Sequence, residues 1–216
     1  AIHSVASYAP LDAWPQRPFR HPHHSASGPA LVGGGSRPQP GEITLAHHGI
    51  LFLDELPEFD RKVLEVLREP LESGEIVIAR ARDKVRFPAR FQLVAAMNPC
   101  PCGYLGDPSG RCRCSAEQIQ RYRSKLSGPL LDRIDLHLHV AREATALHAN
   151  PDSGTSSAQA AATVAAARQR QEQRQGGANA FLDLQQLRQH CGLSDDDQHW
   201  LESACERLGL SLRAAH

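Results

Sequence analysis

An apolar run that passes directly into two adjacent acids constrains this chain more than any other feature. The run is Ile50–Leu53, and Asp54 and Glu55 follow it without a break. Four apolar residues between a glycine turn and a pair of acids are typical of a strand buried on both faces of a parallel sheet. Ligands of α/β folds bind at the carboxyl edge of such a sheet. The two carboxylates are therefore candidate ligand-binding groups.

The segment Gly49–Glu55 has the form of a Walker B motif. In that motif the first acid, here Asp54, helps to hold Mg²⁺, and the second, here Glu55, polarises the attacking water. The competing interpretation is a strand that simply ends in acids. A second buried strand, Phe91–Ala96, leads to the amide side chain of Asn98, which favours the nucleotide interpretation.

The elements between and after these strands predict an α/β fold, a parallel sheet flanked by helices. A helical pattern covers Pro57–Glu72, and a strand period then gives the two arms of a hairpin, Glu75–Ala81 and Val85–Phe91. We place this α/β domain at residues 1–142. A linker follows at 143–157, rich in Asn, Pro, Asp, Ser and Gly. Residues 158–216 form a small helical domain, with helices predicted at 158–175, 182–191 and 195–208.

Basic residues at every second position mark the predicted hairpin tip, at Arg80, Arg82, Lys84 and Arg86. Lys plus Arg and Asp plus Glu both number 24, so the net charge is zero and only such local clusters favour nucleic acid. A basic hairpin could grip phosphates in single-stranded or branched DNA. The alternative is a solvated hairpin whose charges prevent edge pairing.

Four cysteines lie within fifteen residues, at Cys100, Cys102, Cys112 and Cys114. Four thiolates suit tetrahedral Zn²⁺, and we expect a closed, structural zinc site. A cluster of reduced thiols is the alternative. No apolar run approaches the roughly 18 residues of a membrane span, so we expect no membrane partner and a cytoplasmic location.

Long stretches of the chain resemble one bacterial family. The strings PGEITLAHHGILFLDELPEF, ARFQLVAAMNPCPCGYLGD and RYRSKLSGPLLDRIDLH are similar to the magnesium-chelatase-like AAA+ ATPases of the ComM/YifB group. The resemblance implies a partial AAA+ P-loop core with a hairpin before sensor 1, followed by a helical lid. It also implies a hexameric ring that hydrolyses ATP with Mg²⁺ and acts on DNA, as in branch migration during natural transformation.

The same resemblance implies roles for individual residues. Asp54 corresponds to the Mg²⁺-organising acid and Glu55 to the catalytic glutamate. Asn98 corresponds to sensor 1, Arg133 to an arginine finger and Arg213 to sensor 2.

One departure from the family pattern is large. No GxxxxGK[ST] motif occurs in the sequence, so the phosphate-binding loop is missing. We therefore expect this chain to be a fragment that neither binds ATP tightly nor hydrolyses it alone. Two rival functions remain open: the ATPase subunit of a metal chelatase, and a zinc-stabilised DNA-binding module without ATPase activity.

Overall fold

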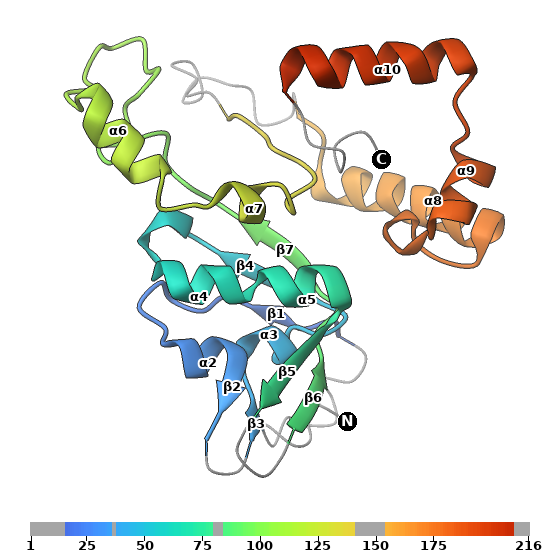
Figure 1. Ribbon diagram of the computed structural model, residues 1–216, viewed down its shortest axis with the longest axis horizontal. Coiled ribbons are helices and arrows are strands. Elements are labelled where there is room, and N and C mark those ends of the chain that lie inside the picture. Colours follow the sequence, from blue (N-terminus) through green and yellow to red (C-terminus); the bar gives the residue numbers. More distant parts are fainter. Residues whose placement is uncertain (1–15, 36–37, 80–83, 141–153, 210–216) are drawn as a thin grey trace. The chain divides into compact units, whose positions relative to one another are not determined.

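The computed structural model describes residues 16–35, 38–79, 84–140 and 154–209. The chain divides into two compact units, residues 1–141 and 142–216. The first contains a parallel sheet, hairpins and short helices, and the second contains helices (Figure 1). The predicted α/β class is confirmed at this level. None of the described helices is both long and apolar enough to cross a membrane.

Three parallel strands form the sheet, in the order β1 (Phe19–Arg20), β4 (Ile50–Leu53), β7 (Gln92–Ala95). β4 is central and pairs in parallel with both neighbours. Leu51 and Leu53 of β4 are fully buried, as their apolar pattern predicts. Gly49 precedes β4 where a Cβ would collide with the Pro18 carbonyl, so the close approach of β1 requires glycine.

Short helices and strands surround this sheet. α2 (Gly28–Val32), β2 (Gly33–Gly34), β3 (Gln39–Pro40) and α3 (Glu42–Leu45) lie between β1 and β4. The described residues before position 42 thus include three short strands. Arg20 makes two hydrogen bonds of 2.6 Å to Glu42, and this pairing joins β1 to α3.

The helix predicted over Pro57–Glu72 is broken. It consists of a 3₁₀ turn η2 (Leu56–Glu58), α4 (Arg61–Val66) and α5 (Arg68–Ser73). Pro70 has no N–H, so the Val66 carbonyl lacks its usual i→i−4 donor and the helix divides near Leu67. Asp60 caps α4, and its carboxylate accepts from the Lys62 N–H at 2.7 Å.

The predicted hairpin is confirmed as β5 (Glu75–Ala79) and β6 (Lys84–Pro88), which pair in antiparallel fashion. It lies next to the small β2–β3 hairpin (Figure 1). A Cβ on Gly33 of β2 would lie 3.2 Å from Ile78 of β5. The second arm ends at Pro88 and not at Phe91, because the Arg90 N–H turns away to donate to His47 Nδ1.

α6 (Ala116–Arg123) and α7 (Gly128–Leu131) follow the cysteine loop. The alternating apolar residues at the end of 130–140 form no strand in the described structure. Leu136, Leu138 and Val140 are 82–89% exposed. Alternation indicates a strand only where a neighbouring strand covers one face, and none of the described strands pairs with this segment.

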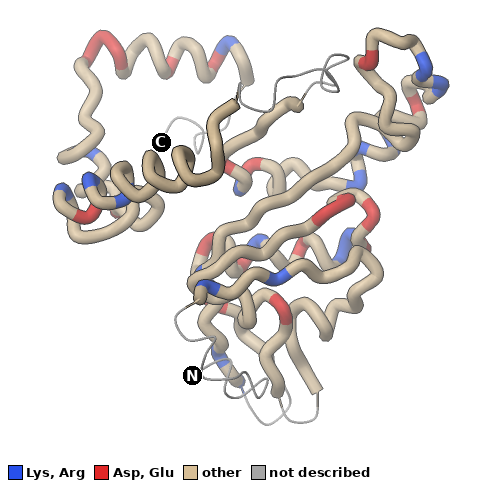
Figure 2. Tube along the Cα trace, turned by 180° about the vertical axis from the view of Figure 1, so that it is seen from behind, with Lys and Arg blue, Asp and Glu red and all other residues tan. Residues whose placement is uncertain are grey.

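The second unit has α8 (Ser157–Gln175), a 3₁₀ turn η5 (Asn179–Phe181), α9 (Leu184–His190) and α10 (Asp195–Leu208). Ser194 caps α10, which begins with the three acids seen in red in Figure 2. Within 154–209 no side chain is buried. Cys191 is exposed and Cys205 is half-buried.

Candidate nucleotide and metal sites

The acidic pair lies where β4 ends. Asp54 and Glu55 are both exposed, and β4 remains paired with β7 up to this point: the Ala96 N–H donates to Leu53 O, and the Leu56 N–H donates to Ala96 O, both at 2.9 Å. Glu55 has φ 51° and ψ 45°. This left-handed conformation costs a non-glycine residue about 1–2 kcal/mol, and such strain gathers at functional sites.

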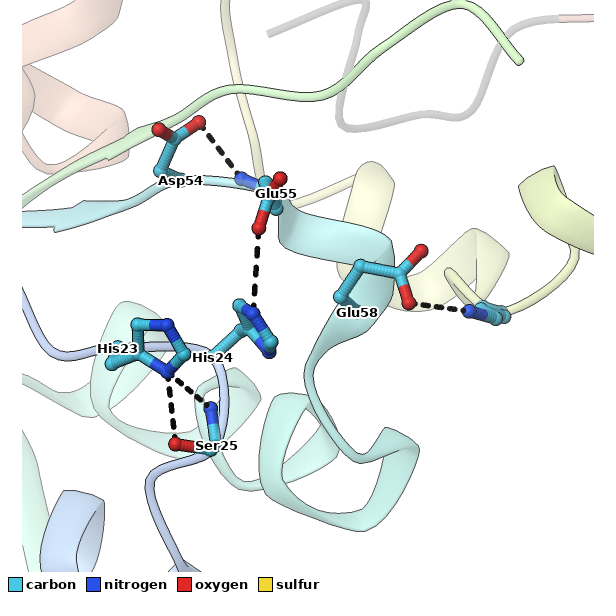
Figure 3. A network of polar contacts seen from close by, with 7 residues as sticks. His23, His24, Ser25, Asp54, Glu55 and Glu58 are labelled. Atoms are coloured by element: carbon cyan, nitrogen blue, oxygen red, sulfur yellow. Dashed lines mark hydrogen bonds and ion pairs between the residues drawn. The ribbon is translucent and has the colours of Figure 1, made fainter. Parts of the chain in front are cut away.

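Glu55 points at a histidine that follows β1. Its carboxylate lies 3.4 Å from His24 Nε2, whereas the Asp54 carboxylate turns back to accept from the Glu55 N–H at 2.8 Å (Figure 3). From the sequence alone, His24 is not identified as a neighbour of Glu55. The parallel pairing of β1 with β4 contains the signal, because residues that follow two adjacent parallel strands meet at one edge of the sheet.

Asn98 follows β7 at this same edge and is exposed. Its backbone is hydrogen bonded to Tyr122 of α6, and Arg123 of α6 donates to Pro99 O at 3.3 Å. Burial and the Glu58 carboxylate raise the pKa of the Tyr122 hydroxyl, and the hydrogen bond with Asn98 opposes this shift. Lys125, just after α6, pairs with Glu58 at 3.2 Å (Figure 3). Helix α6 and Lys125 after it therefore contact the segments that follow β7 and β4.

Arg133 is not free in this structure. It forms an ion pair with Glu72 of α5, and its Nη1 donates to Pro129 O at 2.7 Å. The Arg133 side chain is 16% exposed, and its Nε is buried without a hydrogen-bond partner. The Arg133 side chain therefore binds to groups of its own chain in this structure.

Lys84 and Arg86 lie on one face of the hairpin. Their cross-strand partners are Ala79 and Val77, so they lie on the face opposite Ile76 and Ile78. Counting every second position along the sequence would put Lys84 and Arg86 on the face of Ile76 and Ile78, but the pairing of Ala79 with Lys84 places them on the opposite face. The ion pair between Arg86 and Glu75 is 3.6 Å long, and acidic and basic residues are interspersed over the described trace (Figure 2).

The four cysteines that the sequence marks as zinc ligands lie close together. Their sulfur atoms all lie within 4.8 Å of one another. The Cys100–Cys102, Cys100–Cys112 and Cys102–Cys112 sulfur distances are 3.4, 3.8 and 3.7 Å. All four are free thiols. Hydrogen bonds from the Tyr104 backbone and then from Cys114 lower the pKa of Cys102 to about 6.

Three predicted residues lie outside the described residues, namely Arg80, Arg82 and Arg213. The structure brings Asp54, Glu55 and Asn98 to one sheet edge, and it gathers the cysteines in the loop that follows. Arg133 lies in the segment after α7, at Glu72 of α5.

Comparison with known proteins identifies relatives for nearly the whole chain. The family "Magnesium chelatase, subunit ChlI" matches residues 1–147, and its C-terminal family matches 154–216. "Competence protein ComM" of Haemophilus influenzae is 56% identical over 205 residues, which cover 94% of this chain and 40% of that protein. "Uncharacterized protein YifB" of Escherichia coli is 55% identical over 203 residues, 93% of this chain and 40% of that protein.

A third relative is more distant. The "Magnesium-chelatase 38 kDa subunit" of Acidiphilium rubrum is 36% identical over 70 residues, 32% of this chain and 20% of that protein. The chain spans about two fifths of the length of the first two relatives.

Proposed function

The chain belongs to the magnesium-chelatase ChlI family, and on that premise we propose that it is part of an AAA+ ATPase that acts on DNA in the cytoplasm. Its cofactors are ATP and Mg²⁺, with a structural Zn²⁺ at the four-cysteine cluster. The observation that carries the proposal is the edge shared by β4 and β7, where two adjacent carboxylates and an amide side chain follow paired parallel strands.

Each group has a role in hydrolysis. Asp54 organises Mg²⁺, Glu55 polarises the attacking water, and the Asn98 amide orients that water. Arg133 reaches the ATP of a neighbouring subunit in a hexameric ring, after it has left Glu72. Arg213 belongs to the lid formed by residues 158–216 and contacts the phosphates of the same subunit.

The phosphate-binding loop would come from a further segment. β7 pairs with β4 on one side, and among the described residues no strand pairs with its other side. We propose that a strand ending in a phosphate-binding loop adds there, because it would then open onto the edge that carries Asp54 and Asn98. The β and γ phosphates would meet the backbone N–H groups of that loop.

DNA would contact the two hairpins. The β5–β6 hairpin presents Lys84 and Arg86 on its outer face, and the β2–β3 hairpin lies beside it. The outer basic residues would contact phosphates without reading sequence. The relative of highest identity above is named for competence, and we propose a role in the same process.

The chelatase alternative shares this ATPase chemistry. It is favoured by the match to a magnesium-chelatase 38 kDa subunit, but that match covers 32% of this chain, against 94% for the competence protein. The basic hairpin and the four-cysteine loop also favour DNA over a tetrapyrrole-synthesising partner.

ATP hydrolysis by the full-length protein that contains this chain tests the proposal. We expect hydrolysis to rise with single-stranded or branched DNA and to fall by about 100-fold or more in Glu55→Gln, with ATP binding retained. Glu58→Gln is the matched control, since Glu58 lies three residues away and pairs with Lys125. Full activity in Glu55→Gln would refute the assignment. A rate of ATP hydrolysis that does not change with DNA would favour the metal-chelatase alternative.

A further inference from the structure

The four-cysteine cluster has the dimensions of an occupied zinc site. A tetrahedral ion with Zn–S bonds of about 2.3 Å places its sulfur ligands about 3.8 Å apart. Three of the sulfur pairs lie 3.4–3.8 Å apart, and all six lie within 4.8 Å. A disulfide would need sulfurs about 2.05 Å apart. The sulfurs are therefore gathered at coordination distance and not at bonding distance.

The loop that carries the cysteines has little else to order it. Residues 99–114 contain no helix or strand, and Cys100 is the one residue among them that is buried as a whole. Their backbone hydrogen bonds close local turns, such as Gly103 N–H to Cys100 O at 3.0 Å. Arg111 packs on the Tyr104 ring at 4.7 Å and pairs with Asp107 at 4.0 Å, which are contacts within the loop.

This loop begins at the nucleotide edge. Cys100 is two residues after Asn98, and Gly103 turns back so that a Cβ there would lie 3.9 Å from Asn98 Oδ1. On the other side α6 holds the same segment through Tyr122 at the Asn98 backbone and Arg123 at Pro99 O. Asn98 is therefore placed by two supports, α6 and the cysteine loop.

We infer that a Zn²⁺ ion bound by Cys100, Cys102, Cys112 and Cys114 fixes Asn98 relative to the carboxyl end of β4. The ion replaces the apolar core that this loop lacks, because four bonds to one ion join its first residues to its last. It stays closed to substrate. Its effect on catalysis rests on the proposed ATPase function, but its effect on the position of Asn98 does not.

The first experiment measures metal and order on the chain itself. We expect about one zinc per chain by elemental analysis, lost in Cys112→Ser and kept in Cys191→Ser, whose cysteine is exposed and outside the cluster. Hydrogen exchange of residues 96–104 and 116–126 should accelerate about tenfold when a chelator removes the metal, and recover when zinc returns. The chelation cycle on the unmodified chain keeps the test valid if Cys112→Ser fails to fold.

Three results would overturn the inference. One is a chain without bound zinc. Another is a rate of hydrogen exchange at residues 96–104 that does not change when zinc is removed. The third is visible absorption from an iron–sulfur cluster, the other common occupant of four thiolates.

The second experiment places the effect at Asn98. In the full-length protein, if zinc acts through Asn98, then Cys112→Ser combined with Asn98→Ala should hydrolyse ATP no more slowly than Asn98→Ala alone. If the two substitutions instead lower the rate of ATP hydrolysis by factors that multiply in the double variant, the metal acts elsewhere than at Asn98. If the full-length protein hydrolyses no ATP, the proposed function fails, and zinc content and hydrogen exchange still decide this inference.

Discussion

At the scale of single residues, two functional candidates are held by partners in their own chain. Arg133 is paired with Glu72, and Glu55 faces His24. In the proposed ATPase, each side chain would have to leave this partner before it contacts nucleotide or the attacking water. The strained backbone of Glu55 agrees with a group whose position matters more than its local stability.

Weakening the Arg133–Glu72 pair should ease assembly. In Glu72→Gln we expect ATP hydrolysis by the full-length protein to saturate at a protein concentration up to about fivefold lower, because a partly exposed ion pair is worth at most about 1 kcal/mol. The rate of ATP hydrolysis measured at increasing protein concentration tests this expectation. Glu69→Gln on the same helix is the control. An unchanged concentration dependence would show that Arg133 needs no release.

His24 should restrain Glu55. We expect His24→Ala to raise hydrolysis without DNA by about two- to fivefold, since the removed contact is a partly exposed one. DNA-free and DNA-stimulated rates of the full-length protein, compared with those of His23→Ala, measure this. A fall in both rates would instead assign His24 a supporting role.

At the scale of elements, the basic face of the hairpin makes its own prediction. Replacing Lys84 or Arg86 with alanine should weaken DNA binding by the full-length protein and lower its salt dependence by about one unit of log–log slope per residue. Lys62→Ala, an exposed lysine at the start of α4, is the control. Equal slopes in all variants would exclude phosphate contacts at these positions.

The elements also show what the sequence could predict. β4, β7, the hairpin and α10 were found because their apolar periods are local and their ends carry turn or capping residues. The helix break near Leu67 was not predicted, because the apolar pattern of Pro57–Glu72 continues across it and the only local signal is the missing N–H of Pro70. The strand-like pattern at Leu136, Leu138 and Val140 remained exposed, because pairing depends on a neighbour that local sequence does not describe.

The candidate site divides in the same way. Asp54, Glu55, Asn98 and the four cysteines follow strands or repeat at short spacing, so sequence locates them. The contacts of His24 and Glu72 join residues 31 and 61 positions apart, and only the folded chain reveals them.

At the scale of the whole molecule, we expect the side of β7 that faces away from β4 to determine how the chain associates. Among the described residues no strand pairs with that side, and Val94 and Met97 beside it are 38% and 41% exposed, so it forms an edge that other strands can join. We expect the 216-residue chain to self-associate as its concentration rises and to hydrolyse no ATP. Light scattering and a phosphate-release assay measure both. A monomer at high concentration would show that this edge is protected.

Because of that edge, the chain could be complemented by a strand from a second polypeptide. The carboxylates at the end of β4 sit on one polypeptide, and the strand that fills the side of β7 could be supplied on another. Regained ATP hydrolysis would then report that the two polypeptides had associated, so the edge that we expect to drive self-association would also detect a strand that complements it.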